Sequence, residues 1–317
     1  MSLSVSQPNW KITQETPSLM LASLSHFGLI EVTGEQGRSF IHGQVTTDIT
    51  SLEANQWRWG AHCDAKGKML ASFRAFAIHD SLFMLMPANN IESDLAQLKK
   101  YAVFSKAELE NASANWLLIG IAGMDAKAFV EQQFGSIDAQ LTLVDGGAII
   151  KDGERYIAML THDKATTLCE NHTLFDATAW QALEIIAGYP NIQVQHAGQY
   201  VPQMCNVQAI NGISFTKGCY MGQETIARMK YRGGNKRALY ILSGNTHQNL
   251  TANSSIEIAL EEGYRKAGNI IEFVQQGEQV LLTAVLANDT QADATLRIAE
   301  DEQSSLSVMA LPYSLVD

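Results

Sequence analysis

The first third of the chain alternates apolar and polar residues in short runs that favour strands. Extended segments separated by turn residues are predicted at 29–33, 57–63, 69–78 and 82–86. Asp64 to Gly67, between two of these segments, has the composition of a hairpin turn whose glycine adopts a positive φ. Helical spacing of apolar residues predicts a helix that opens at Gly34-Glu35 and another over 89–101.

The pattern then changes twice. Four strands are predicted at 116–122, 140–144, 148–151 and 156–160, and two helices at 125–134 and 163–171, which together make most of a ferredoxin-like unit. One further helix is predicted over 177–187, ended by Gly188, Tyr189 and Pro190. After Gly233-Gly234, six short strands predict a small β-barrel, at 239–242, 256–259, 269–274, 280–286, 295–298 and 306–309.

Composition is typical of a globular protein with more than one domain. The 317 residues are 46% hydrophobic and 17% charged, which excludes a disordered chain, and the length favours two or three domains. The densest apolar run, residues 116–122, is far shorter than the ~20 residues that cross a bilayer. Residues 1–17 lack the basic start and apolar middle of a secretion signal. We therefore expect a cytoplasmic protein with no membrane partner.

Cysteine spacing and charge narrow the function classes. The four cysteines, at 63, 169, 205 and 219, form no CxxC pair, so neither a disulfide framework nor a metal site is predicted. The net charge of −11 disfavours a general nucleic-acid binder. Five cations nevertheless fall within ten residues that contain no acid: Arg228, Lys230, Arg232, Lys236 and Arg237. Such a run is either a solvated loop or an anchor for an anionic ligand tail or RNA phosphate.

The most informative segment is the octet Lys217-Gly218-Cys219-Tyr220-Met221-Gly222-Gln223-Glu224, called the signature loop below. Its two glycines allow a tightly turned backbone, and a helix is predicted just after it, at 225–230. Cys219 would lie beside a cation and near the positive end of that helix, and both favour thiolate over thiol. Cys219 is therefore the candidate reactive thiol, with a half-buried structural cysteine as the alternative.

The octet resembles the signature Lys-Gly-Cys-Tyr-x-Gly-Gln-Glu of the YgfZ family. Seven positions match: Lys217, Gly218, Cys219, Tyr220, Gly222, Gln223 and Glu224. Residues 62–69, 99–106, 233–239 and 311–315 are also similar to the bacterial family, so the resemblance runs nearly end to end. It implies a folate-binding protein linked to tRNA modification and to the maintenance of iron–sulfur enzymes.

The family is similar to the T-protein of the glycine cleavage system, and this implies an α+β fold. Two intertwined mixed αβ lobes, one of them ferredoxin-like, would precede a small C-terminal β-barrel. We expect residues 1–112 and 177–232 to form the folate-binding lobe, 113–176 the ferredoxin-like lobe and 235–317 the barrel. The boundary at Gly233-Gly234 is the best marked.

The resemblance also implies where folate binds. It places a ligand-lining tryptophan at Trp180 and a second aromatic position at Phe27, which keeps a stacking face but lacks an indole N–H. Glu184, one helical turn from Trp180, is a candidate acceptor for the pterin edge. From the residues alone, Trp180 also suits a helix core and Glu184 a solvated face. Candidates for binding an anionic group are Lys66, Lys68, Arg228, Lys230 and Arg232.

Catalytic status is left open. Aminomethyl transfer by the T-protein depends on an adjacent pair of aspartates, and the matching positions here are Ala71 and Ser72, which cannot share a proton with an amine. Cys219 as a nucleophile would need a general base, such as His62 or His42. One thiolate is too few for a four-cysteine cluster, although Cys63 could approach it. Sharing a cluster with a partner, or carrying a persulfide, suits a single exposed thiol better.

The leading hypothesis is a folate-binding protein that supports tRNA modification, with tetrahydrofolate or a one-carbon derivative as cofactor. Its partners would be reduced folate and, indirectly, tRNA-modifying iron–sulfur enzymes, while direct contact with tRNA is left open. The alternatives are a folate-dependent one-carbon transfer enzyme and a scaffold for iron–sulfur assembly with a vestigial pocket.

Overall fold

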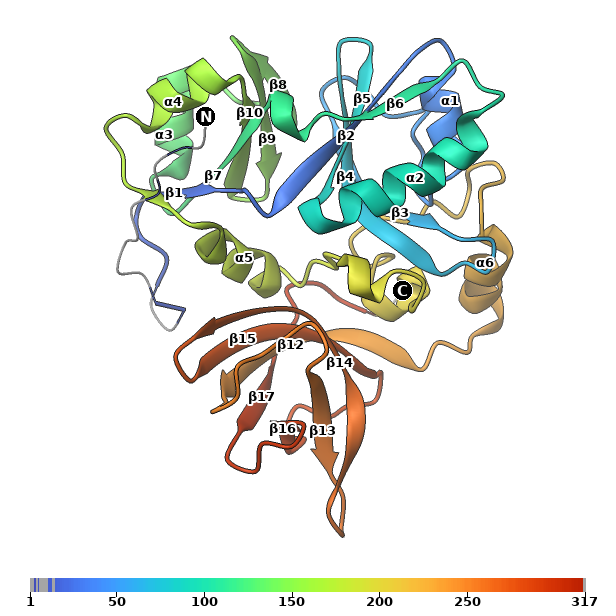
Figure 1. Cartoon of the computed structure of the whole chain (residues 1–317), viewed down its shortest axis with the longest axis vertical. Helices are drawn as coiled ribbons and strands as arrows, with labels where there is room; N and C mark the ends of the chain where they lie inside the picture. The colour runs from blue at the N-terminus through green and yellow to red at the C-terminus, as the bar shows by residue number, and fades with distance from the viewer. Residues whose placement is uncertain (1–2, 4, 6–10, 13–14, 316–317) are drawn as a thin grey trace.

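The computed structural model of the chain describes residues 3, 5, 11–12 and 15–315. Two αβ lobes lie side by side and a β-barrel lies below them (Figure 1). Most of the polar segment 1–17, on which the expectation about a secretion signal rests, lies outside the described residues. Within the described part, no helix combines the length and the apolar character needed to cross a membrane.

The first lobe is an antiparallel five-stranded sheet in the order β3-β4-β5-β2-β6. Its strands are β2 (Phe27–Thr33), β3 (Trp57–Cys63), β4 (Met69–Ile78), β5 (Ser81–Pro87) and β6 (Glu108–Asn111). Two helices, α1 (Gly37–His42) and α2 (Ile91–Ala102), pack on one face through Phe40, Leu95 and Leu98. The predicted hairpin turn is confirmed, with Gly67 at φ +74°. The short polar strand β6 was not predicted.

The second lobe is a six-stranded sheet in the order β11-β1-β7-β10-β9-β8. Its strands are β1 (Met20–Ser23), β7 (Leu117–Ala122), β8 (Leu141–Val144), β9 (Gly147–Asp152), β10 (Arg155–Leu160) and β11 (Leu174–Phe175). One face is covered by α3 (Ala126–Phe134) and α4 (His162–Cys169). The other face shares a core with the first lobe and with α5 (Ala177–Ile186). The four predicted strands and three predicted helices of this region are therefore present.

One strand of the second sheet, β1, precedes the strands of the first sheet in the chain. β1 lies directly before β2 in the chain, yet Leu21 pairs with Ile121 and Leu174 of the second sheet. The predicted division assigned residues 1–112 to the first lobe, whereas β1 joins the second sheet in space. This crossing gives physical meaning to the expected intertwining. The residue limits proposed for the two lobes stay a prediction.

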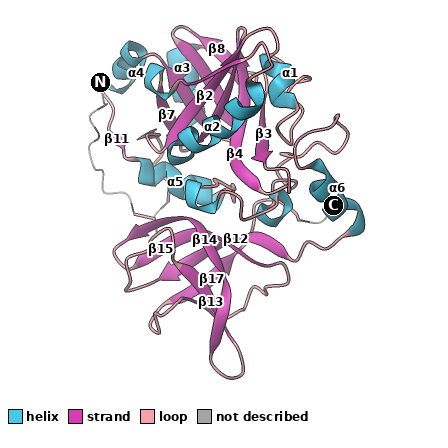
Figure 2. Ribbon diagram, turned by 45° about the vertical axis from the view of Figure 1, so that its right-hand side comes forward, coloured by secondary structure: helices cyan, strands magenta, loops and turns pink. Residues whose placement is uncertain are grey.

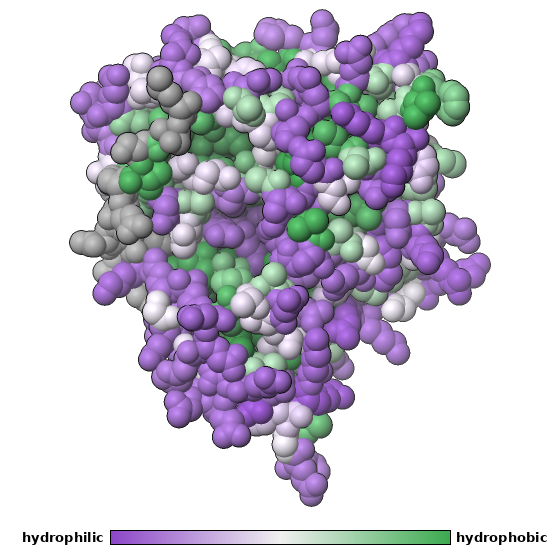
Figure 3. Space-filling model, in the orientation of Figure 1, coloured by the Kyte–Doolittle hydropathy of each residue, from purple (hydrophilic) through white to green (hydrophobic). Residues whose placement is uncertain are grey.

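A closed barrel in the order β12-β15-β14-β13-β16-β17 completes the fold, as predicted. Its strands are β12 (Arg237–Asn245), β13 (Ser255–Ala259), β14 (Tyr264–Gln276), β15 (Gln279–Ala287), β16 (Leu296–Ile298) and β17 (Ser305–Met309). The chain enters it from α6 (Gln223–Arg232), and α5 lies next to the barrel (Figure 2). Ile241 and Val274 of the barrel pack with Ile185 of α5. Hydrophobic residues gather between the barrel and the lobes, while the lower barrel surface is hydrophilic (Figure 3).

Connections between these elements include four short 3-10 helices, η1 (Ala88–Asn90), η2 (Ser113–Asn115), η3 (Val194–His196) and η4 (Pro202–Cys205). The stretch from η3 to α6 runs over the first lobe and contains the signature loop. Gly198 N donates to Met69 O and Met69 N donates to Tyr200 O, so this stretch is tied to the start of β4. The segment around Gly198 and Tyr200 is thereby held against the β3–β4 hairpin.

Candidate functional site

A buried arginine stands at the junction of the three units. Arg74, in the middle of β4, is 0% exposed, and its Nη2 donates to Glu184 Oε1 and Oε2 at 2.9 Å and to Asp152 Oδ2 at 3.0 Å. A buried charge requires such partners, because desolvation otherwise costs several kcal/mol. Burial raises the pKa of Glu184 and of Asp152, but the neighbouring arginines outweigh it and lower the pKa of both carboxyls. Both are therefore ionised.

Arg155 completes this charge cluster. Its Nη2 donates to Asp152 Oδ2 and to Glu184 Oε1, both at 2.8 Å. Two arginines thus balance two carboxylates, one from each of β4 and β10 against one from each of β9 and α5. Tyr189 adds a third donor to Asp152, through its hydroxyl at 2.7 Å from Oδ1. The cluster holds the two lobes and α5 in one arrangement.

The barrel joins the cluster through a third carboxyl. Asn191 Nδ2 donates to Glu184 Oε2 and to Glu272 Oε2, each at 3.1 Å. Glu272 lies in β14 and is 3% exposed. Burial, reinforced by the negative charge of Glu184, raises the pKa of Glu272 to about 8. Glu272 is therefore largely neutral at pH 7, and it joins the cluster without adding an unbalanced charge.

Aromatic rings surround the Arg74 guanidinium. The carbon Cζ lies 4.3 Å from the ring centre of Trp59, 5.0 Å from that of Tyr189, 5.7 Å from that of Trp57 and 5.8 Å from that of Phe27. Cation–π attraction of this kind is stronger where water is excluded. The rings therefore stabilise the buried charge and make a rigid aromatic wall.

Two cavities share Tyr189 in their walls. The Trp59 cavity, of about 520 Å³, is lined by Trp57, Trp59 and Tyr313 among others. The Arg155 cavity, of about 770 Å³, is lined by Lys127, Arg155 and Leu183 among others. Both include Asp152, Ala187, Tyr189 and Pro312 in their walls. Volumes of this size suit a small organic ligand.

Several buried donors beside these cavities have no hydrogen-bond partner among the described residues: Trp59 Nε1, Arg74 Nε and Nη1, and Arg155 Nη1. Both ring nitrogens of His26 are also unpaired. The pKa of that histidine is lowered to about 4, mainly by burial. Buried polar atoms in folded proteins are nearly always hydrogen-bonded. Donors left in this state next to a cavity are suited to acceptor atoms of a ligand or to water.

The three residues predicted to bind folate come together around Arg74. The predicted helical neighbours Trp180 and Glu184 are in contact, with Trp180 Nε1 donating to Glu184 Oε1 at 3.0 Å. Phe27 packs in the same core as Trp180. All three are buried, and neither of the two cavities is lined by any of them. The solvated face considered for Glu184 is wrong, and the ligand roles of the three residues stay predictions.

Trp180 and Glu184 already have full sets of contacts. A Cβ on Gly120 would lie 2.2 Å from Trp180 Cε3, so the indole packs on the backbone of β7, and the Arg155 guanidinium lies over the indole at 4.8 Å. Both oxygens of Glu184 accept hydrogen bonds from the surrounding side chains. In this arrangement Glu184 positions the two arginines, and the arginines carry the free N–H groups.

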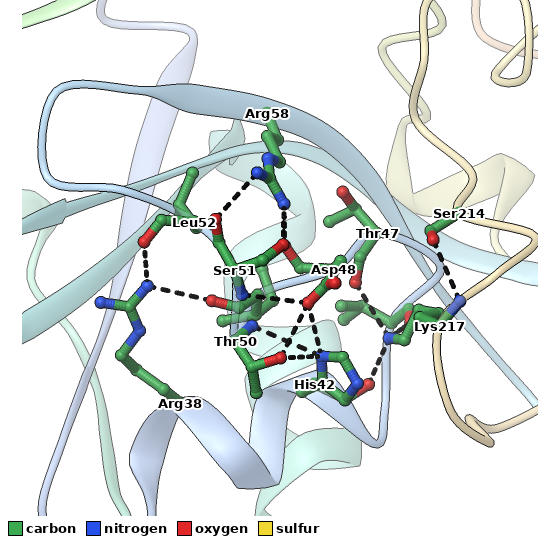
Figure 4. A network of polar contacts seen from close by, with 12 residues as sticks. Arg38, His42, Thr47, Asp48, Thr50, Ser51, Leu52, Arg58, Ser214 and Lys217 are labelled. Atoms are coloured by element: carbon green, nitrogen blue, oxygen red, sulfur yellow. Dashed lines mark hydrogen bonds and ion pairs between the residues drawn. The ribbon is translucent and has the colours of Figure 1, made fainter.

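Lys217 anchors the signature loop. Its Nζ donates to the backbone oxygens of His42 and Thr47, the latter at 2.9 Å (Figure 4). It also donates to Val45 O at 2.7 Å and lies 4.9 Å from the Tyr220 ring centre. Burial lowers the pKa of Lys217 to about 8. The ammonium group of Lys217 thus binds the turn after α1. From the sequence, a cation was expected beside Cys219 instead.

The turn after α1 also reaches the Trp59 cavity. Asp48 Oδ1 accepts from Thr50 Oγ1 at 2.8 Å and lies 3.2 Å from His42 Nδ1. Arg58, in the wall of the Trp59 cavity, donates from Nη1 to Asp48 O at 2.6 Å and to Ser51 Oγ at 2.8 Å (Figure 4). A continuous set of hydrogen bonds therefore connects the signature loop to the cavity wall.

The glycines of the signature loop have different roles. Gly222 has φ +79° and precedes α6, and Met221 N donates to Gly43 O at 3.1 Å. Gly218 has no heavy atom within 4 Å of where a Cβ would be. Tyr220 is buried, Glu224 is exposed, and Gln223 begins α6 two residues before the predicted helix. The loop is held at Lys217, Tyr220 and Gly222.

Cys219 is exposed, whereas Cys63 and Cys205 are buried. His62, one of the two proposed bases, is 1% exposed with Nδ1 2.7 Å from Asp94 Oδ1, so it is enclosed between β3 and α2. The other, His42, is held by Asp48 and lies in the segment that Lys217 binds. Among the described residues, no three His, Cys, Asp or Glu side chains are grouped for a metal ion. The chemical role of Cys219 stays a prediction.

The cations predicted to bind an anion lie elsewhere. Lys66 is exposed on the hairpin turn, Lys68 Nζ donates to Gln199 O at 3.1 Å, and the other three are on α6: Arg228, Lys230 and Arg232. The cations that do line the two cavities are Arg58, Lys127 and Arg155. Ala71 and Ser72 are buried, and Ser72 Oγ donates to Pro190 O and accepts from Ile192 N. Anion binding by the five predicted cations stays a prediction.

Sequence reasoning missed most of the central cluster. Arg74 lay in a predicted strand, Asp152 and Arg155 fell between two predicted strands, and Tyr189 was assigned only to the end of a helix. A signal was present, because an arginine within the apolar run Phe73-Arg74-Ala75 must find buried partners. The identity of those partners depends on sheet pairing that a single sequence does not reveal.

Comparison with known proteins agrees with this architecture. The family model described as "YgfZ, beta-barrel domain" matches residues 235–301, and that described as "GCVT N-terminal domain" matches residues 13–145. The "tRNA-modifying protein YgfZ" of Photobacterium profundum is 38% identical over 95% of this chain and 93% of its own length. The protein of the same name from Yersinia pestis is 39% identical over 94% of each chain.

Among solved structures, the glycine cleavage system aminomethyltransferase T from Bartonella henselae covers 94% of this chain and 86% of its own. Its TM-score is 0.66 and its sequence identity 17%, so this likeness concerns the fold. The T-protein-like fold expected from the sequence is confirmed.

Proposed function

This chain belongs to the YgfZ family, and from that premise we propose that it is a folate-binding protein that acts in tRNA modification. Its relatives are named tRNA-modifying proteins, and its fold is that of an aminomethyltransferase. The ligand is a reduced folate, tetrahydrofolate or a one-carbon derivative. The site is the pair of cavities that share Tyr189 in their walls.

The observation that carries this proposal is the set of partnerless buried donors beside an aromatic wall. A pterin is a flat ring with nitrogen and oxygen acceptors on its edge. Trp57, Trp59 and Tyr189 offer ring faces in the Trp59 cavity, and Trp59 Nε1 lacks a partner. Ring faces bind flat ligands and a few convergent donors orient them. The residues present therefore fit a pterin.

The acidic tail of a folate needs cations. Lys127 and Arg155 in the Arg155 cavity, or Arg58 in the Trp59 cavity, supply them close to the proposed ring site. Arg58 is already held by Asp48 and Ser51, whereas Arg155 retains an unpaired Nη1. We therefore place the tail in the Arg155 cavity, reached past Tyr189.

Cys219 is proposed to act at the protein surface. It is exposed, and it is linked to the cavity wall through Lys217, the turn after α1 and Arg58. In this proposal folate supports the site from within, and the thiol meets a tRNA-modifying iron–sulfur enzyme from outside. Transfer of an aminomethyl group by an acid pair is not part of the proposal, since Ala71 and Ser72 occupy those positions.

A matched pair of tryptophan variants tests folate binding. Trp57 and Trp116 are both partly buried and pack against the same core, but Trp116 lines a different cavity. We expect tetrahydrofolate, added under anaerobic conditions, to bind the wild type and Trp116→Leu with similar affinity by isothermal titration calorimetry. Trp57→Leu should bind about 5-fold or more weakly, since stacking contributes about 1 kcal/mol or more. Equal affinities, or no heat in the wild type, would refute the folate site.

A cellular experiment tests the tRNA role. Nucleosides of total tRNA are analysed by mass spectrometry in a strain that lacks this gene, complemented with the wild type, Cys219→Ala or Cys169→Ala. We expect methylthio-modified nucleosides to fall in the deletion strain and to be restored by the wild type and by Cys169→Ala, but not by Cys219→Ala. Unchanged nucleosides in the deletion strain would reject the tRNA role, and full rescue by Cys219→Ala would reject the role of the thiol.

A further inference from the structure

The barrel carries a cavity unrelated to the proposed folate site. It has a volume of about 660 Å³ and lies where the chain enters the barrel, between β12, β14 and the loop that follows β15. Four cations line it: Lys236, Arg237, Arg265 and Lys266. We call it the barrel groove. A concentration of positive charge on a chain of net charge −11 is the first reason to ask what it binds.

The groove is formed by segments that are far apart in the sequence and tied together by the backbone. Arg237 pairs with Ala287 in the barrel, and its Nη1 donates to Ala267 O at 3.2 Å. Asn288 N donates to Lys236 O at 3.0 Å and Asn288 Nδ2 donates to Asn235 O at 3.0 Å. The four cations therefore face a cavity of defined shape, which is more than a chance gathering of surface lysines.

The groove lining has a net positive charge, since its four cations exceed its two carboxylates, Asp289 and Asp293. In the part of the chain that the structure describes, none of the four cations forms an ion pair. Glu257 lies opposite Lys266 in the β13–β14 ladder, but its carboxylate binds Arg297 at 2.8 Å. Four exposed like charges held together raise the local potential and attract a polyanion. Binding of anionic groups in the groove would lower the repulsion between these cations.

We propose that the barrel groove binds the sugar–phosphate backbone of RNA, with tRNA as the RNA in question. The choice of tRNA rests on the proposed function. Cations in the groove meet the phosphates, and Asp289 and Asp293, which also line it, accept hydrogen bonds from ribose 2′-hydroxyls or base amino groups. Such donors are present in RNA and absent from a bare phosphate ion, so the mixed lining favours RNA.

The basic helix α6 extends this surface. Arg228, Lys230 and Arg232 lie on α6, and the linker from Gly233 to Asn235 leads from it directly to Lys236. Backbone phosphates of RNA repeat every few ångströms, so a line of cations binds a longer segment than one pocket does. The run of cations noted in the sequence thereby becomes the approach to the groove, and the signature loop lies at the opposite end of the same helix.

The test compares two variants with the same change of charge. Arg265→Gln/Lys266→Gln removes two groove cations whose side chains are exposed, and Lys99→Gln/Lys100→Gln removes two exposed cations of α2. Binding of an unmodified, fluorescently labelled tRNA transcript to the full chain is measured by anisotropy between 50 and 300 mM KCl. Thermal unfolding of each variant checks that the fold is intact.

We expect the groove variant to bind the transcript roughly 25-fold more weakly at 0.1 M salt, with the slope of log affinity against log salt reduced by about 1.4. The loss of log affinity in the α2 variant should be less than a third of the loss in the groove variant. Equal losses in the two variants would overturn the proposal. So would tighter binding to vesicles of phosphatidylglycerol than to tRNA, with the groove variant losing only the vesicle binding.

Failure of the groove and failure of the proposed function give different results. The groove variant should bind tetrahydrofolate as the wild type does, because none of its substituted residues lines the two cavities beside Tyr189. If the deletion strain keeps its modified nucleosides while the groove variant loses tRNA affinity, the tRNA-modification role fails and the groove stands. If the deletion strain loses them and both variants bind tRNA as the wild type does, the groove fails and the role stands.

Discussion

Gly222 of the signature loop packs directly on Gly67 of the β3–β4 turn. A Cβ built on Gly222 would lie 2.7 Å from Gly67 Cα and 2.5 Å from Asp64 O, and Gly222 has φ +79°. Two turns separated by more than 150 residues of sequence therefore meet through their backbones, and neither has room for a side chain at the contact. The start of α6 is positioned by this contact.

Gly222→Ala should destabilise the protein by about 2 kcal/mol, because the added methyl group meets backbone atoms and the positive φ is strained for alanine. Gly218→Ala in the same loop is the control, since a Cβ there meets nothing within 4 Å. Urea unfolding followed by circular dichroism measures both. A loss of equal size in the two variants would mean that the Gly67 contact is not the cause.

Lys217→Met should release the signature loop. The substitution keeps the aliphatic length but leaves three backbone oxygens of the turn after α1 without their donor, at a cost of about 3 kcal/mol. Hydrogen exchange followed by mass spectrometry should show faster exchange at the Met221 and Ser214 amides, which bond to that turn. Lys66→Met, on an exposed turn residue, should leave their exchange unchanged.

Alkylation should distinguish the four cysteines. Under native conditions at pH 7.5 iodoacetamide should modify Cys219 first, because it is exposed. Burial raises the pKa of Cys63 and Cys205 and raises that of Cys169 to about 11, so these thiols react slowly. Peptide mass spectrometry locates the label. Early labelling of Cys63 or Cys205 would contradict the burial described above, and Cys219→Ala should abolish the fast phase.

Glu272 should make stability depend on pH in a definite direction. Its pKa rises from an ordinary 4.5 to about 8 in the folded chain, so the folded state holds a proton that the unfolded state has released between these values. Its contribution is complete below pH 4.5 and is lost as the pH rises toward 8, by up to about 1.4 kcal/mol per pH unit.

Glu272→Gln keeps a neutral acceptor for Asn191 and removes the proton. The difference in unfolding free energy between variant and wild type, measured by urea titration from pH 5 to 8.5, should therefore increase with pH in favour of the variant. Glu278→Gln, at an exposed barrel carboxylate, is the control and should show little trend. A flat difference for Glu272→Gln would show that the carboxyl is ionised throughout this range.

Much of the fold could be predicted because its signals are local. Strong β patterns between turn residues located β3, β4 and five of the barrel strands to within about three residues, while β14 begins five residues before the predicted strand. β1 and β6 were not predicted. Met20 to Ser23 is too short to show a hydrophobic period, and Glu108 to Asn111 is a polar strand at the edge of its sheet. The pairing of β1 with β7 is a non-local choice, decided by packing.

The candidate site was predicted only where it lies on one helix. The contact between Trp180 and Glu184 follows from their spacing of four residues on α5. The side chains that give the site its charge, Arg74, Asp152 and Arg155, come from strands of two sheets, and only the folded chain shows them as one cluster. The barrel groove was not predicted for the same reason, since its four cations lie on two separate segments of the sequence.

The position of β1 in the second sheet affects how the chain can fold during its synthesis. β1 pairs with β7 at Ile121 and with β11 at Leu174, so the second sheet lacks its full complement of strands until more than half of the chain has left the ribosome. β2, by contrast, finds β5 early. The apolar strand β1 therefore has no partner strand until β7 is made and keeps an open edge until β11 is made, which makes this stage the one most exposed to misfolding and to binding by chaperones.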